Sequence, residues 1–465
     1  MRILIVSNLF PPGFIGGYEL GALDVAKELA SRGHDVHVLT SNYFDGDLPE
    51  SDGLSVERSL YCAQFSNDPL GLDFHKSVFA NPHNVRLSAA ALRRLRPDAV
   101  LMFNLTGLGA HALLRFFDAS GVPLFLYLMD NVLAGQKNSP AHFAAYKAAH
   151  GNPPLSSTTR VIAMSQIVAE EFFACIGREM ETLIVPGWAD LRRADFTPRP
   201  RIGAKTRFVF ASRIAKHKGV DILLDALETL VGSGVDGFEI DFYGNGDVAW
   251  LTNEIAARRL GHAVAYRGEL QKEQMLDALY DYDCLVLPTW RREPLPFIVC
   301  EAAVAGCVPI FTQGIGVDIW FVDGEDCLKI SRNPRAVAQA MRRLLEDGAA
   351  LERLRARTFE TSRRNFSFQR NLDKIEAALA AAPKKQDVQP KQIEAALTYL
   401  NLFLHERQHG PVLPDGRLAT QHDMRRADLR SLATRALAEF LLTFGRAWGL
   451  RRVMALGDAL YAQAL

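Results

Sequence analysis

Short apolar runs rich in β-branched residues alternate with longer amphipathic stretches over the first 188 residues of the chain. Runs of four to eight such residues predict buried strands, and apolar positions three or four apart predict helices. The predicted strands of this half are residues 2–7, 34–40, 98–104, 122–128, 160–165 and 182–187. The predicted helices are residues 19–32, 85–95, 107–118 and 166–176. This alternation predicts a parallel sheet with helices on both faces.

The alternation stops over residues 189–206, which carry many charges, two prolines and no periodicity, and which we predict to be a linker. It then begins again. The predicted strands of the second half are residues 207–212, 238–244, 263–268, 283–289, 308–312 and 326–330. Long helices are predicted over residues 334–347, 349–364 and 368–382.

We therefore predict an α/β protein in which two Rossmann-like, doubly wound domains face each other across a cleft, followed by a helical C-terminal extension. The predicted parts are a first domain over residues 1–188, the linker 189–206, a second domain over 207–365, a helix over 366–382 that returns to the first domain, and the extension 383–465. In such sheets, ligands bind beyond the carboxyl ends of the strands. The extension has two interpretations, which are docking onto the body of the protein and contact with a membrane surface or a partner.

The composition narrows the class of protein. Lys+Arg and Asp+Glu both number 53 in 465 residues, and this balance argues against nucleic acid as the main partner. No apolar run reaches the roughly 18 to 20 residues of a membrane-spanning helix, and the opening run 1–10 is predicted to be a buried strand. The six cysteines form no CxxC or metal-ligand spacing, which favours buried thiols in a reduced cytoplasmic protein.

Two loops that follow predicted strands carry residues suited to binding an anion. Gly16 and Gly17 precede a helix, where glycines allow close approach of a ligand and free amides attract negative charge. The spaced glycines of a dinucleotide fingerprint are absent, which argues against an NAD enzyme. Arg213 and Lys218 follow the first strand of the second half, and two cations there can neutralise a diphosphate. A solvated loop with ordinary surface charges is the alternative.

Two carboxylates flank the apolar stretch "PLPFIV" that follows the predicted strand 283–289. Pro296 suits the first turn of a helix ending at Gly306, and the amides near Phe297 and Ile298 would then form an anion site. Glu293 precedes this helix and Glu301 lies about one turn inside it. Because a carboxylate can accept two hydroxyls, each glutamate is a candidate for binding the diol of a ribose or a hexose.

These motifs resemble those of the retaining GT-B glycosyltransferases of glycosyltransferase family 4. "EPLPFIVCEA" resembles the family's paired-glutamate signature, and "SRIAKHKGVDILLDAL" resembles its "GR…KG" segment. "FYGNGD", "YRGELQKEQMLDALYDYDCLVLPT" and "PPGFIGGYE" match further family segments, so the resemblance covers roughly residues 1–380. It does not extend to the last 75 or so residues.

The resemblance implies a role for each candidate residue. Arg213 and Lys218 would bind the donor diphosphate, Glu301 the nucleotide ribose and Glu293 the donor sugar. The amides of Phe297 and Ile298 and the Gly16–Gly17 loop would complete the phosphate site. No cofactor or metal is expected, because cations and helix amides neutralise the phosphates. The implied donor is a nucleotide sugar linked to UDP or GDP.

One position departs from the family pattern. Met129 stands where a histidine is usual, and Asp130 follows it as expected. With Tyr18, these residues are candidates for a sugar or acceptor pocket.

We expect a cytoplasmic enzyme that transfers a hexose, with retention, to a glycan or lipid-linked acceptor in cell-surface polysaccharide synthesis. The extension offers peripheral contact with the inner face of the membrane. The alternatives are a GT-B sugar-nucleotide epimerase or hydrolase, and a non-catalytic binding or scaffold subunit, for which Met129 is the main argument.

Overall fold

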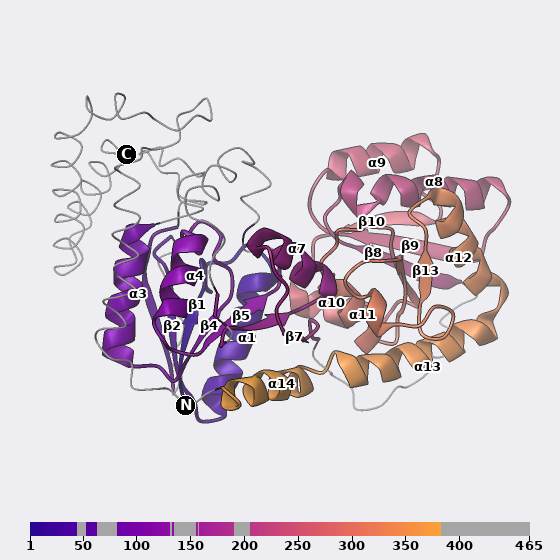
Figure 1. Ribbon diagram of the computed structural model, residues 1–465. Coiled ribbons are helices and arrows are strands. Elements are labelled where there is room, and N and C mark those ends of the chain that lie inside the picture. Colours follow the sequence, from indigo (N-terminus) through magenta and orange to yellow (C-terminus); the bar gives the residue numbers. More distant parts are fainter. Residues whose placement is uncertain are drawn as a thin grey trace, which may run out of the picture. The chain divides into compact units, whose positions relative to one another are not determined.

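A computed structural model of the chain describes residues 1–43, 53–62, 81–130, 133, 155–156, 158–189 and 205–382. These residues form two compact units (Figure 1). The first comprises Met1–Ile162, Ala169–Leu183 and the last described residues from Ala378, and the second comprises Ala163–Val168 and Ile184–Ala377. Most of the predicted linker and the whole predicted extension 383–465 lie outside the described residues. The predicted cleft and the return of helix 366–382 to the first domain stay predictions.

The first unit contains a seven-stranded sheet in the order β3-β2-β1-β4-β5-β6-β7. Its strands are β1 (Arg2–Val6), β2 (Asp35–Ser41), β3 (Leu54–Leu60), β4 (Ala99–Met102), β5 (Leu124–Leu128), β6 (Arg160–Ala163) and β7 (Thr182–Ile184). Strand β1 pairs in parallel with β2 and with β4. Six of these strands were predicted, and β3 was not. It is an edge strand, "LSVERSL", that is mostly half-buried and carries adjacent charges, so its apolar signal is weak.

Helices pack on this sheet because its central strands are apolar on both faces. The helices are α1 (Gly17–Ser31), α3 (Pro82–Leu95), α4 (Ala110–Ala119) and α7 (Gln166–Ile176). Ile3, Leu4, Ile5 and Val6 of β1 have no exposed surface, as expected for a strand covered on both sides.

The second unit contains a six-stranded sheet in the order β10-β9-β8-β11-β12-β13. Its strands are β8 (Thr206–Ala211), β9 (Phe238–Tyr243), β10 (Val264–Gly268), β11 (Cys284–Leu287), β12 (Val308–Thr312) and β13 (Leu328–Ile330). Every neighbouring pair in this sheet is parallel. All six strands were predicted from the sequence, and the prediction is confirmed. Strands β11 and β12 are apolar and fully buried, which is the pattern of a strand covered on both faces, whereas β9 and β10 also carry charged residues.

Helices cover both faces of this second sheet. The helices that pack with it are α8 (Val220–Gly232), α9 (Val248–Ala257), α10 (Lys272–Leu279), α11 (Phe297–Val304), α12 (Pro334–Glu346) and α13 (Gly348–Asn365), with short 3-10 turns η1 (Lys216–Lys218) and η2 (Asp318–Trp320). Helix α14 (Phe368–Ala380) follows α13 and does not lie on this sheet. Figure 1 shows α8 and α9 on one side of the sheet and α10 and α11 on the other. Helix α12 packs against α8, and α13 packs against α11.

The strand orders define where a ligand can enter each unit. In the second unit the chain runs outward from β8 to β10 and then returns to place β11 on the other side of β8. The loops after β8 and β11 therefore leave the sheet in opposite directions, which opens a crevice at their carboxyl ends. In the first unit the corresponding pair is β1 and β4. These two switch points determine which loops can hold functional residues.

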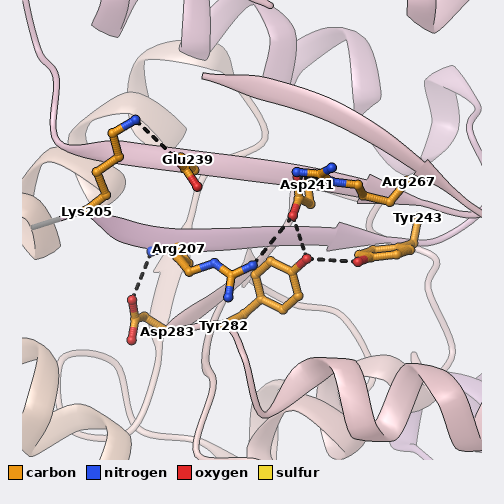
Figure 2. Close-up of polar contacts among 8 residues, drawn as sticks. All are labelled: Lys205, Arg207, Glu239, Asp241, Tyr243, Arg267, Tyr282 and Asp283. Carbon is orange, nitrogen blue, oxygen red and sulfur yellow. Dashed lines mark hydrogen bonds and ion pairs between the residues drawn. The ribbon is translucent and has the colours of Figure 1, made fainter. Parts of the chain in front are cut away.

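One face of strands β8 to β10 carries a polar cluster, shown in Figure 2. At its centre is Asp241, a carboxylate in a strand interior that is almost fully buried. Its oxygens accept hydrogen bonds from Arg267 Nε at 2.9 Å and from the Tyr282 hydroxyl at 2.6 Å. Arg207 approaches to 3.9 Å and also stacks on the Tyr282 ring. Burial and the Asp241 carboxylate raise the pKa of Tyr282, so this hydroxyl keeps the proton that it donates.

We expect Asp241→Ala to lower the free energy of unfolding by about 2–3 kcal/mol, because two hydrogen bonds involving a buried charged group are lost. The matched control is Glu239→Ala, on the same strand and face, where a half-exposed ion pair with Lys205 is worth at most about 1 kcal/mol. Urea unfolding of the full chain measures both variants. Equal effects would show that Asp241 is not the anchor of this face.

Candidate functional site

The loop after β8 carries two of the predicted cations and is shaped by a glycine. Arg213 is exposed, and Lys218 ends the 3-10 turn η1. Gly219 joins η1 to helix α8 with a φ of +80°, which L side chains rarely adopt. A Cβ atom at Gly219 would lie 2.1 Å from the carbonyl oxygen of Pro288. Only glycine therefore allows the loop after β8 to pack directly on the end of β11.

The loop after β11 is tied to the loop after β8 by backbone and side chain. The Trp290 amide donates to the His217 carbonyl at 2.9 Å, and the two rings meet edge to face with centroids 5.4 Å apart. One residue further along the first loop, Lys218 Nζ lies 2.5 Å from Glu293 Oε2. The predicted phosphate-binding lysine and the predicted sugar-binding glutamate thus form a direct ion pair, which the sequence analysis did not predict.

Glu293 is held in a buried position by a further hydrogen bond. Only 8% of its surface is exposed, and the Thr289 hydroxyl donates to the same oxygen, Oε2, at 3.0 Å. The backbone carbonyl of Glu293 accepts from the Gly316 amide at 2.9 Å. A buried carboxylate requires such partners, because an unpaired charge in this position would be strongly unfavourable.

Helix α11 begins directly after this loop. Pro296 is the N-cap residue, with φ −74° and ψ 110°, so it lies just outside the helix and not in its first turn as predicted. The correction is small, because a proline at either position removes an amide that has no helical acceptor. Phe297 and Ile298 are the first two helical residues, and their amides have no acceptor within the helix. Glu301 follows about one turn later and is 8% exposed, as the sequence analysis placed it.

The start of α11 is braced by the segment after β7. A Cβ atom at Gly187 would lie 2.8 Å from the Leu295 side chain and 2.9 Å from Phe297, so glycine permits this close packing. Trp188 is buried between Phe297, at 6.3 Å, and Phe368 of α14, at 5.0 Å between ring centroids. The amides that could bind an anion therefore lie at a rigid helix terminus.

The electrostatics at this edge of the sheet favour a negatively charged ligand. Burial, together with the positive charges of Lys218, Arg213 and Arg332, lowers the pKa of His217, and Glu293 opposes the shift. One carboxylate thus faces several cations around the loop. Among the residues that the structure describes, Arg213 makes no hydrogen bond or ion pair, so its guanidinium is available to a ligand.

In the first unit, the glycine loop after β1 lies beside the loop after β4. Gly16 and Gly17 stand at the start of α1, and the Glu19 carboxylate accepts from the amides of Ile15, at 3.2 Å, and Gly16, at 3.0 Å. Asn104, after β4, donates to the other oxygen of Glu19 at 3.4 Å. The Glu19 carboxylate therefore occupies the amide of Gly16, which was predicted to bind an anion. A Cβ atom at Gly16 would meet no atom within 4 Å, so this loop leaves open space beside it.

The three residues predicted to line a sugar or acceptor pocket also meet at this edge. Met129 and Asp130 follow β5, Met129 buried and Asp130 exposed. The Tyr18 hydroxyl donates to the Tyr127 carbonyl at 2.8 Å. Burial raises the pKa of Tyr18, and the nearby Asp130 carboxylate raises it further. The structure therefore brings these three residues together, while their contact with a substrate stays a prediction.

The residues that the structure describes contain no group of three or more His, Cys, Asp or Glu side chains placed to hold a metal ion. Within the same residues, no helix is long and apolar enough to cross a membrane.

Two family models match the chain. Residues 16–188 match the model described as "Glycosyl transferase 4-like domain", and residues 205–347 match "Glycosyl transferases group 1". Among known proteins, glycogen synthase of Mycobacterium tuberculosis is 27% identical over 412 residues, which cover 84% of this chain and 97% of that protein. A glycosyltransferase of Methanocaldococcus jannaschii without an assigned function is 21% identical over 382 residues, which cover 75% of this chain and 90% of that protein.

Solved structures share the fold. Sucrose-phosphate synthase from Thermosynechococcus elongatus has a TM-score of 0.64 at 16% identity, over 82% of this chain and 100% of that chain. Anabaena HepE, solved in complex with UDP-glucose, has a TM-score of 0.61 at 20% identity, with the same coverage of both chains. At such identities the likeness concerns the fold alone, and it confirms the predicted GT-B class.

We expect Gly219→Ala to displace the loop that carries Lys218, because the new Cβ atom would overlap the Pro288 carbonyl in addition to the strain of a positive φ. The control is Gly234→Ala, at φ +71° with no atom within 4 Å of the new Cβ, which should cost only about 1–2 kcal/mol of backbone strain. Urea unfolding of both variants gives the comparison. A cost at Gly219 no larger than at Gly234 would contradict the tight packing of the two loops.

Proposed function

The chain belongs to the glycosyl transferases group 1, and we propose that it moves a hexose from a nucleotide-sugar donor to a glycan or lipid-linked acceptor with retention of configuration. The observation that carries the proposal is the Lys218–Glu293 ion pair at the β8–β11 switch point, with Arg213 beside it. The lysine can bind the negative charge of a diphosphate, and the glutamate can bind the hydroxyls of the sugar that is attached to it.

The donor is a UDP- or GDP-linked sugar. HepE, which shares the fold, was solved with UDP and with UDP-glucose, and this supports a nucleoside diphosphate as the leaving group. Arg213, Lys218 and the amides of Phe297 and Ile298 would bind the diphosphate. Glu301 would bind the ribose.

In the reaction, the bond between the anomeric carbon and the diphosphate oxygen breaks, and both bonding electrons remain on the diphosphate. Arg213, Lys218 and the α11 amides stabilise this developing charge, which is the main catalytic contribution and does not require a metal. Glu293 holds the sugar through its hydroxyls. The acceptor hydroxyl attacks the anomeric carbon on the face from which the diphosphate leaves and passes its proton to the departing phosphate oxygen, so the configuration is retained.

The acceptor binds to the first unit, where Tyr18, Met129 and Asp130 lie together. We place the enzyme in the cytoplasm, in the synthesis of a cell-surface polysaccharide. Met129 cannot donate a hydrogen bond as a histidine would, so Glu293 is the side chain that we propose holds the donor sugar.

The C-terminal residues 383–465, outside the described part of the chain, contain leucines and aromatics mixed with arginines, and we propose that they contact the inner face of the membrane. The full chain should float with anionic liposomes, and a chain truncated after residue 383 should not. Liposomes of neutral lipid serve as the control for charge. Equal flotation of both chains would exclude this role.

The donor is identified with a panel of UDP, GDP and ADP and their hexose conjugates, with and without a chelator. The true donor should raise the melting temperature in both conditions, because only the folded chain binds it. Incubation with that donor alone and then with acceptor glycans separates transfer from hydrolysis or epimerisation, and NMR of the product gives the anomeric configuration. A conversion that needs no acceptor, or an inverted product, would contradict the proposal.

Arg213→Ala and Lys218→Ala should each lower kcat by about 100-fold to 1,000-fold, because a donor group at the departing charge is lost. Lys216→Ala is the matched control, since Lys216 is an exposed lysine in the same loop. Transfer rates at saturating donor measure the effect. Full activity of either test variant would remove that residue from the catalytic site.

A further inference from the structure

Thr289, the last residue of the family-like segment 266–289, was assigned no role from the sequence, yet it contacts the proposed catalytic site directly. It follows strand β11, its surface is fully buried, and its hydroxyl donates to Glu293 Oε2 at 3.0 Å. Lys218 Nζ approaches the same oxygen at 2.5 Å. A carboxylate oxygen has two lone-pair directions, so these two donors occupy both sites on Oε2.

The other oxygen of Glu293 has a different environment. Among the residues that the structure describes, no donor makes a hydrogen bond to Oε1. Its two lone-pair directions are therefore available to hydroxyl groups of a ligand. In Glu293, Oε2 is thus bound by the protein, while Oε1 is open to a sugar.

The turn from Thr289 to Glu293 is fixed at one end by the last residue of β12 and at the other by the loop that follows it. The Thr289 carbonyl accepts from the Thr312 hydroxyl at 2.8 Å, and the Glu293 carbonyl accepts from the Gly316 amide at 2.9 Å. Thr312 is itself buried at the end of β12. The Thr289 hydroxyl is thus a fixed point toward which the Glu293 side chain is oriented.

We propose that Thr289 is a positioning residue for Glu293, and that its hydroxyl holds the carboxylate so that Oε1 faces the hydroxyls of the donor sugar. The inference rests on the proposed function. Without the hydroxyl, only Lys218 orients the carboxylate. An ammonium is a point charge that can attract both oxygens, and the terminal torsion of a glutamate is soft. Rotation toward Lys218 would then draw Oε1 away from the ligand.

Three variants test the proposal. Thr289→Val keeps the shape but removes the hydroxyl, Thr289→Ser keeps the hydroxyl, and Thr361→Val is the matched control. Thr361 is also a buried threonine whose hydroxyl donates to a carboxylate, Asp326, at 2.6 Å, but it lies on α13 and its partner precedes β13. The ligands are UDP-glucose, GDP-mannose and ADP-glucose, each compared with its free diphosphate by calorimetric titration of the full chain.

We expect Thr289→Val to weaken binding of the nucleotide sugar about tenfold or more while changing binding of the free diphosphate less than twofold, because only the sugar contacts Oε1. Thr289→Ser should restore the affinity, and Thr361→Val should not change it. In a Glu293→Gln background, Thr289→Val should add little further loss, since the two residues act as one unit.

The opposite results have distinct meanings. Equal weakening of sugar and diphosphate binding, or a full additional loss in the Glu293→Gln background, would show that Thr289 only supports the loop and would overturn the positioning role. Unchanged binding by Thr289→Val alongside a weakened Glu293→Gln would overturn it as well, while the proposed function would stand. If Glu293→Gln binds normally, or the unmodified chain binds no nucleotide sugar, the proposed function itself fails and the inference fails with it.

Discussion

The ion pair between Lys218 and Glu293 is the interaction on which the site in the second unit depends. Each residue follows a different strand, and the pair is possible because β8 and β11 lie side by side in parallel, with Cys284 opposite Phe208. Burying two charges is unfavourable unless they meet at close range and find further partners. The 2.5 Å contact and the Thr289 hydroxyl meet that requirement. The pair therefore fixes the distance between the loop after β8 and the loop after β11, which we propose bind the phosphates and the sugar of the donor.

This constraint also explains the glycines at the site. The two loops must approach closely enough for a lysine and a glutamate to touch, and Gly219 permits this by placing its Cα against the Pro288 carbonyl. Further along the same edge, Gly244 at φ +128° lies against the Ser212 carbonyl, where a Cβ atom would be 2.1 Å away. The loop that carries Arg213 is thus packed between its neighbours on both sides. If Arg213 is the catalytic cation that we propose, a backbone held in this way would need little reorganisation as charge develops on the ligand.

Much of this arrangement could be predicted from the sequence. The six strands of the second unit are short and rich in β-branched and aromatic residues, and the residues after them were recognised as candidates because parallel strands present their carboxyl ends at one edge. Strand β3 was missed, since an edge strand that is half-buried and carries Glu57 and Arg58 lacks a continuous apolar run. The family segments identified Arg213, Lys218, Glu293 and Glu301 by position. They gave no indication that Lys218 and Glu293 contact each other or that Thr289 joins them.

The sequence by itself determined the alternation of elements, the fold class and the residue types available for chemistry, because these follow from local periodicity and short motifs. The tertiary structure alone decided which of these groups meet. Lys218 and Glu293 are 75 residues apart in the chain, and their contact exists only because the sheet turns back at β8 and places β11 beside it. That contact decides that Oε2 of Glu293 is bound by the protein and that Oε1 is not. Hydrogen bonding depends on differences of a few tenths of an ångström, and no local sequence pattern encodes such distances.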